Sequence, residues 1–207
     1  MTEAADLPLF PLNTVLFPGG LLPLRVFEPR YVDMVGACLK NGGEFGVCLI
    51  TEGREVGAPA EPADAGCRAR IVDWSMPQQG VLNIVTTGTT RFRVLSTSVS
   101  AAGLVSARVV GIAADPDEAV PDEFSHCARL LERVVAQFNA QKESADNNGM
   151  LLPITPPYRY DDAAWVANRL AELLPIPLPV RQRLMVQRGG VARLAEVARI
   201  LAKREAR

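Results

Sequence analysis

The feature that most constrains the fold of this chain is a change in the spacing of its apolar residues near Ile112. Before that residue, short runs rich in Val, Ile, Leu and Thr are separated by Gly and Pro, and several runs are apolar at every second position. This spacing is typical of half-buried strands. Beyond it, apolar residues recur at steps of three and four, as in amphipathic helices. We therefore predict an α+β fold, with a strand-rich subdomain at residues 1–113 and a helical bundle subdomain at residues 114–207.

Seven runs in the first part have the composition of strands. Phe92 and Val94, for example, alternate with arginines, so one face of that run is apolar. Many short antiparallel strands favour a small β-barrel, because closure leaves no exposed strand edge. One helix is expected after Glu28, since Pro29 suits a first helical position and Gly42 suits a helix end. The expected strands are residues 7–12, 21–27, 44–51, 66–74, 80–88, 91–98 and 104–112.

Four helices are expected in the second part. An apolar stripe runs through residues 124–138, and Asp161 can cap the next helix. The prolines of residues 175–179 end that helix, and the last of them can open a third one. A fourth apolar stripe covers residues 191–201. The pattern therefore predicts a helical bundle.

Composition excludes several classes of protein. The net charge is −1, so no overall field attracts nucleic acid or an anionic membrane, and we expect neither as a partner. The N-terminus carries Glu3 and Asp6 without Lys or Arg, and prolines interrupt the apolar residues that follow. We predict no signal peptide, no membrane helix and a cytoplasmic location. Without an export signal, we expect free, buried thiols at Cys38, Cys48, Cys67 and Cys127.

No catalytic constellation is present in the sequence. The only histidine, His126, precedes Cys127 within an expected helix, where adjacent side chains point about 100° apart and would not form a dyad. One histidine also cannot supply a Cys/His zinc site. There is no Walker loop, no G-x-S-x-G and no H-E-x-x-H. We therefore expect no enzyme activity, no metal and no cofactor.

Three segments together carry a family resemblance. The stretch LPLFPLNTVLFPGGLLPLRVFEPRYVDMV, residues 7–35, resembles the opening of the Lon protease N-terminal domain family, also called the LON substrate-binding domain. Residues 66–95 resemble the strands of that family that end in a Gly-x-x-Arg-Phe turn. Residues 167–201, with their Leu-Pro break, resemble the closing bundle. The resemblance spans residues 7–201.

The resemblance implies a PUA-like small antiparallel β-barrel followed by a C-terminal helical bundle. It also implies a role in recognising polypeptides, often unfolded or degron-bearing, for a protease or chaperone machine. The sequence ends at Arg207 without the family's ATPase and peptidase modules, so we expect a stand-alone, non-catalytic interaction module. Weak self-association is a further expectation, because bundles of this kind can associate.

The family's opening motif has two interpretations in this sequence. In the structural interpretation, Phe17 and Phe27 fill the core, prolines shape strand edges and turns, and Glu28 caps the short helix. From its place in the motif, Arg91 is a candidate buried partner of Glu28. The residues given a structural role are Leu12, Pro23, Leu24, Phe27, Glu28, Arg91 and Phe92.

In the functional interpretation, part of the same segment forms an exposed apolar patch around the turn at residues 18–20. Alternating strands cannot bury every apolar residue there. Such a patch would hold an extended hydrophobic peptide, with help from an open strand edge. The candidate peptide-binding residues are Leu16, Phe17, Pro18, Leu21, Leu22, Arg30 and Tyr31.

Two alternative functions stay open at this point. PUA-like barrels can bind RNA, although the charge balance does not favour it. A cleft between the barrel and the bundle could instead hold a small molecule, if polar groups converged there.

Overall fold

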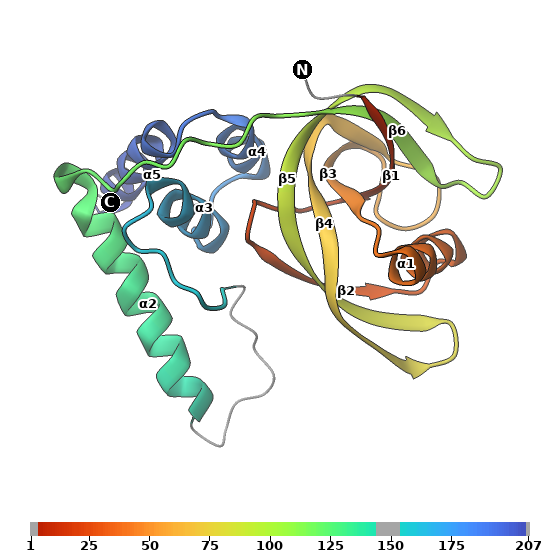
Figure 1. Ribbon diagram of the computed structural model, residues 1–207, viewed down its shortest axis with the longest axis horizontal. Helices are drawn as coiled ribbons and strands as arrows, with labels where there is room; N and C mark the ends of the chain where they lie inside the picture. The colour runs from red at the N-terminus through yellow and green to blue at the C-terminus, as the bar shows by residue number, and fades with distance from the viewer. Residues whose placement is uncertain (1–3, 144–153, 206–207) are drawn as a thin grey trace. The chain divides into compact units, whose positions relative to one another are not determined.

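The computed structural model describes residues 4–143 and 154–205 and divides the chain into two compact units (Figure 1). Unit 1 comprises Met1–Ala114 together with Leu178–Val186, and unit 2 comprises Asp115–Pro177 together with Gln187–Arg207. The predicted α+β class is confirmed, since strands fill unit 1 and most helices belong to unit 2. The predicted boundary near residue 113 stays a prediction, and the structure adds that a later segment groups with unit 1.

One sheet of six strands forms unit 1, in the order β2-β5-β4-β3-β1-β6. β5 also pairs with β6, so five of these strands close into a ring and β2 extends from β5 alone. The expectation of purely antiparallel pairing is wrong for β1 and β3, which run parallel. Their connection contains β2 and a helix, and such a long crossover allows parallel pairing. The strands are β1 (Ala5–Leu12), β2 (Leu21–Val26), β3 (Phe45–Glu52), β4 (Glu61–Gln78), β5 (Val81–Val99) and β6 (Val105–Gly111).

Two of the expected strands, residues 80–88 and 91–98, are one long strand, β5. Gly88, expected to end the first of them, instead lies in mid-strand because the turn after β1 packs against it. The Gly19 N–H donates to the Gly88 carbonyl, and the Gly88 N–H donates to the Gly20 carbonyl, both at 2.8 Å. A Cβ on Gly88 would lie 2.1 Å from the carbonyl oxygen of Phe17, so only glycine permits this approach.

The predicted helix of the first part is confirmed as α1 (Pro29–Asn41). Its first residue is the expected proline, and it ends at Gly42, whose φ of 64° favours glycine. The helix buries Tyr31, Val35 and Cys38 against the inner face of the sheet, beside core residues of β1, β3 and β5. This packing leaves α1 next to the connection that follows β2.

Unit 2 contains the short 3₁₀ helix η1 (Asp122–Phe124) and the helices α2 (Ser125–Glu143), α3 (Ala163–Leu173) and α5 (Gly190–Glu205). The cap of α3 is Asp162, not the predicted Asp161: its side chain accepts a hydrogen bond from the Trp165 N–H at 2.9 Å. Inside the unit, the buried Arg193 donates to Asp115 at 2.8 Å and to Asn168 at 3.0 Å. This ion pair fixes the chain after β6 to the helices.

The helix α4 (Leu178–Val186) belongs to unit 1, although the spacing of apolar residues places it in the bundle. Two hydrogen bonds explain its position. Arg91 of β5, which is almost fully buried, donates to the Met185 carbonyl at 3.1 Å, and Gln182 donates to the Ala65 carbonyl at 2.9 Å. The expected pair of Arg91 with Glu28 is therefore wrong: a buried guanidinium needs acceptors, and here backbone carbonyls supply them.

Candidate functional site

The first half of the opening segment is core. Leu16 is buried and Phe17 has no exposed surface, because the turn that follows them is hydrogen-bonded onto Gly88. The expectation that these two side chains belong to an exposed patch is therefore wrong. Pro18, at the turn, is only partly buried.

β2 is an edge strand. Among the described residues it pairs only with β5, in a register that sets Leu22 opposite Thr86 and Pro23 opposite Val85. Its candidate residues Leu21 and Leu22 are half-buried, as is Leu24. In an antiparallel pair, alternate peptide groups point away from the partner strand, so one side of β2 keeps peptide groups without a strand partner.

Phe27 is not the core residue that the sequence pattern predicts, because half of its surface (50%) is exposed. The physical reason is its place in the chain. β2 ends at Val26, which is buried, and α1 begins at Pro29, so Phe27 lies in the short connection where the alternation of faces turns it outward. The core position belongs to its neighbour Val26.

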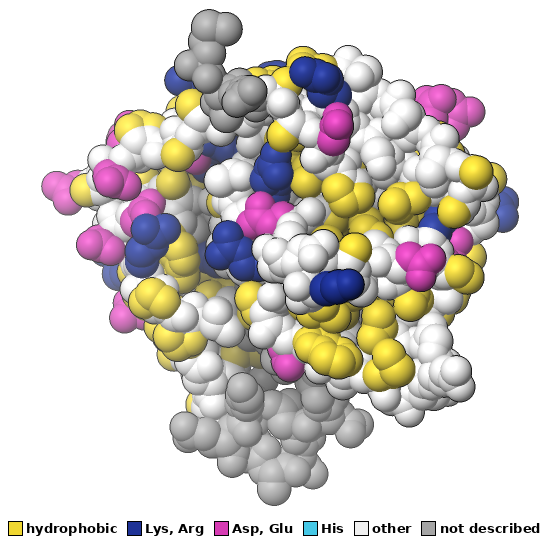
Figure 2. Space-filling model, turned by 45° about the vertical axis from the view of Figure 1, so that its right-hand side comes forward, with side chains coloured by type: hydrophobic (Ala, Val, Ile, Leu, Met, Phe, Trp, Pro, Cys, Tyr) yellow, Lys and Arg dark blue, Asp and Glu magenta, His cyan; other side chains and the backbone are white. Residues whose placement is uncertain are grey.

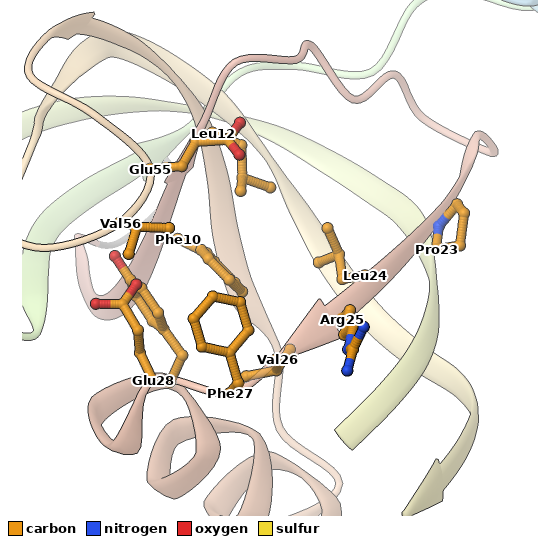
Figure 3. A pocket seen from close by; sticks show the side chains of 11 residues that line it. Phe10, Leu12, Pro23, Leu24, Arg25, Val26, Phe27, Glu28, Glu55 and Val56 are labelled. Atoms are coloured by element: carbon orange, nitrogen blue, oxygen red, sulfur yellow. The ribbon is translucent and has the colours of Figure 1, made fainter. Parts of the chain in front are cut away.

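An apolar groove of about 180 Å³ lies beside Phe27 (Figure 3). Phe10 and Leu12 of β1 form one wall, and β2 with Leu24 forms the other, while the Phe27 ring stands between them. The groove lies on the side of β2 where no other described strand pairs with it, so its walls are the apolar inner faces of two strands that do not pair with each other. The lining residues are Phe10, Leu12, Pro23, Leu24, Arg25, Val26, Phe27, Glu28, Tyr31, Glu55 and Val56.

Two carboxylates lie on the β1 side of this groove, with Val56 between them, whereas Arg25 lies on the β2 side (Figure 3). Glu28 occupies the cap position of α1, but its side chain does not cap the helix as expected. Its Oε2 instead accepts from Arg30 at 2.9 Å and from the Gly57 N–H at 3.3 Å. Oε1 of Glu55 accepts from the Asn13 N–H at 2.5 Å. Each carboxylate is thus held through one of its oxygens.

Arg30 and Tyr31, both candidates for peptide binding, are buried. The guanidinium of Arg30 donates to the Gly103 carbonyl at 2.9 Å and lies 4.7 Å from the centre of the Tyr31 ring. The ring of Phe10 stacks on Tyr31 at 4.0 Å between centroids. Burial raises the pKa of the Tyr31 hydroxyl, with a lowering by Arg30 and a further raising by Glu28, so this group is protonated at neutral pH. Tyr31 therefore lines the groove, and Arg30 supports it from behind.

A second set of exposed apolar side chains was not expected from the sequence. Val72, Trp74 and Met76 lie near the tip of the β4–β5 hairpin, and each exposes more than half of its surface. Leu95 and Val99 of β5 are similarly exposed. Figure 2 shows hydrophobic side chains, in yellow, gathered over the strand-rich part of the surface with few charges among them. An apolar strand run looks the same in sequence whether or not another element covers it, so no signal marked these residues.

The pair His126 and Cys127 differs from expectation. Nε2 of the imidazole lies 3.4 Å from the Cys127 sulfur, and Nδ1 lies 3.0 Å from the Glu123 carbonyl oxygen. The prediction that the two side chains diverge is therefore wrong. Cys127 has no exposed surface, however, so no substrate reaches its thiol. In the described part of the chain, no three His, Cys, Asp or Glu side chains come together as metal ligands would.

All four cysteines are free and buried, as predicted. None of the helices within residues 4–143 and 154–205 combines the length and the apolar character that a membrane crossing requires.

Comparison with known proteins places this architecture in one family. Residues 6–203 match the model of the ATP-dependent protease La (LON) substrate-binding domain. The crystal structure of a Lon N-terminal domain protein from Xanthomonas campestris is 36% identical, with a TM-score of 0.74, over 94% of this chain and 97% of that one. The N-terminal domain of the Lon protease of the Mycobacterium avium complex is 15% identical, with a TM-score of 0.59 over 93% and 96%, and shares the fold. The chain therefore belongs to the LON substrate-binding domain family.

Proposed function

We propose that this chain is a non-catalytic module that binds extended apolar segments of other polypeptides in the groove between β1 and β2. Membership of a substrate-binding domain family supports polypeptides as the ligand class. Unfolded or degron-bearing chains offer such segments, and a protease or chaperone machine would use the captured chain. Of the predicted candidates, Leu21, Leu22 and Tyr31 keep a place in or beside this site, and Leu24 and Phe27 join them.

The observation that carries the proposal is the half-exposed ring of Phe27 in an apolar groove next to an unpaired strand edge. Burying such a ring against a ligand is favourable by about 25 cal/mol for each Å² of apolar surface removed from water. The groove is also lined by Phe10 and Leu24, whose positions are fixed by the sheet, so little order is lost on the protein side when a ligand binds.

The edge of β2 supplies the polar part of the interaction. A peptide laid along it would satisfy the peptide groups that face away from β5, as in other cases of strand addition. Pro23 has no N–H to offer, which leaves a gap in that ladder and limits regular aggregation through this edge. Because a flexible peptide loses conformational freedom on binding, we expect dissociation constants in the micromolar range, about −8 kcal/mol.

Fluorescence anisotropy of a labelled, permanently unfolded polypeptide tests this proposal. Phe27→Ala should weaken binding about tenfold, because it removes a half-exposed aromatic ring that lines the groove. Leu95→Ala is the matched control, since it removes an equally exposed apolar side chain outside the groove, and its affinity should equal that of the wild type. Equal affinities for the wild type and Phe27→Ala would contradict the proposed site. The same protein should neither hydrolyse ATP nor cleave the bound polypeptide.

A further inference from the structure

The β1 side of the groove offers acceptors that the protein itself does not use. Oε2 of Glu28 and Oε1 of Glu55 accept hydrogen bonds from the protein, whereas the other oxygen of each carboxylate has no donor among the described residues. Both side chains line the groove on the side of Val56 (Figure 3). A carboxylate held by one oxygen keeps its position and presents its second oxygen to a ligand.

The hydroxyl of Tyr31 is the third such group. Tyr31 is 3% exposed and lines the groove, yet no described residue forms a hydrogen bond with its hydroxyl. The hydroxyl oxygen is not among the buried side-chain atoms that lack a partner, so it is open to water in the groove, and a ligand donor can take the place of that water. Phe10 and Arg30 hold the ring on its two sides, so the hydroxyl cannot turn away to find another one.

These acceptor oxygens are matched best by a basic side chain of the ligand. Lys and Arg carry several N–H donors and no acceptor, so either can donate to carboxylate and hydroxyl oxygens on this side of the groove. The apolar stem of such a side chain also packs on aromatic surface, here that of Phe27. An acidic side chain would meet repulsion from Glu28 and Glu55. Arg25, on the opposite wall, repels a cation there and so favours one orientation of the ligand.

We propose that the groove prefers polypeptide segments in which a large apolar residue stands next to a Lys or Arg. The apolar side chain packs beside Phe27, and the basic one extends to Glu28, Glu55 and the Tyr31 hydroxyl. This inference rests on the proposed function, because it names the sequence class that the same site selects. It makes recognition more selective than burial of apolar surface alone would.

The test uses three labelled peptides that differ at one residue beside a central Leu-Phe pair, namely Lys, Gln or Glu. Anisotropy titrations of the full chain should give the Lys peptide about fivefold tighter binding than the Gln peptide, the size expected for a partly shielded ion pair. The Glu peptide should bind more weakly than both. Raising the salt concentration to about 0.5 M should reduce the differences, since exposed charges are then screened.

Two variants locate the preference. Glu55→Gln should bring the Lys-to-Gln affinity ratio close to one, while the amide oxygen can still accept from the Asn13 N–H. Tyr31→Phe should lower the ratio by a smaller factor. Glu61→Gln is the matched control, because this exposed acid lies on β4 outside the groove, and its ratio should stay at the wild-type value.

The outcomes separate the two proposals. Peptides that bind equally well with Lys, Gln or Glu, and lose affinity in Phe27→Ala, would overturn the inference and leave the proposed function intact. A Lys preference that survives Glu55→Gln would also overturn it, because the charge would then act elsewhere. If none of the three peptides binds, both the inference and the proposed function fail.

Discussion

Two neighbouring parts of the opening segment, residues 7–20 and residues 21–28, are both rich in apolar residues but differ in their surroundings. In the first part, β1 has a strand neighbour on each side, because it pairs with both β3 and β6. The turn that follows β1 is hydrogen-bonded to β5. Within residues 4–143 and 154–205, the second part has a single strand neighbour, β5. Phe17 is consequently buried and Phe27 is half-exposed.

The comparison indicates that the packing around a side chain, and not its hydrophobicity, decides which apolar residues remain available for binding. An apolar side chain between two strand neighbours is used for stability. On the edge strand β2 only the side chains that face the core are covered, as Val26 is, and Phe27, which turns outward just after the strand, stays accessible.

The largest expected effect comes from exchanging the two phenylalanines for alanine. Phe17→Ala should lower the free energy of unfolding by about 3–5 kcal/mol, because it opens a cavity in the core. Phe27→Ala should cost less than about 1 kcal/mol, because water already reaches half of that ring. Urea unfolding followed by circular dichroism measures both values. Equal losses for the two variants would remove the distinction between the two parts.

A smaller effect is expected at the contact that buries the first part. Gly88→Ala should destabilise the protein by about 2 kcal/mol, because the new Cβ would overlap the Phe17 carbonyl oxygen. Gly36→Ala is the matched control. Gly36 lies inside α1 with nothing within 4 Å of an added Cβ, so alanine should be neutral or stabilise the helix by up to about 1 kcal/mol. Thermal unfolding of both variants checks the pair, and a neutral Gly88→Ala would show that the turn is loosely attached.

The smallest expected effect concerns Cys48, which packs with Leu7 and Leu9 of the first part. Burial, with a contribution from Asp64, raises the pKa of its thiol to about 12 from an ordinary value of 9.0. Below pH 9 the thiol is protonated in both states and adds no pH dependence. Above pH 9 only the unfolded chain ionises, so stability falls, by about 1.4 kcal/mol at pH 10.

Urea unfolding at pH 8 and pH 10 measures this loss. Cys48→Ala is the control. Between pH 8 and pH 10 its free energy of unfolding should fall by about 1.4 kcal/mol less than that of the wild type. The same fall in both proteins would mean that water reaches the thiol in the folded state.

Much of the fold follows from the sequence, because local signals agree with the tertiary structure. Both limits of α1 can be predicted locally, because Pro29 suits its first position and Gly42 suits its C-terminal cap. The parallel pairing of β1 with β3 does not follow, because strand alternation specifies which face is buried and not which neighbour pairs. The position of α4 also depends on distant partners, Arg91 and Ala65, which no local pattern contains.

The candidate site is less predictable than the fold. The sequence singles out the segment that lines the proposed groove. The motif interpretation, however, places Phe17 on the surface or in the core and Phe27 only in the core. The alternation that buries Val26 instead turns the next side chain outward, and the strand ends there. Glu55 and Val56 come from a loop whose sequence shows no apolar periodicity, so their approach to the groove is visible only in three dimensions. The RNA-binding and small-molecule alternatives stay predictions.

The placement of α4 has a consequence for dissecting this protein genetically. Because Leu178–Val186 completes unit 1 although it is encoded between two helices of unit 2, the polypeptide passes from one unit to the other three times. A gene fragment that stops at codon 114 would leave the Arg91 guanidinium without the Met185 carbonyl that it contacts. A transplant of unit 1, which carries the proposed groove, would therefore need residues 178–186 rejoined to it through a designed linker.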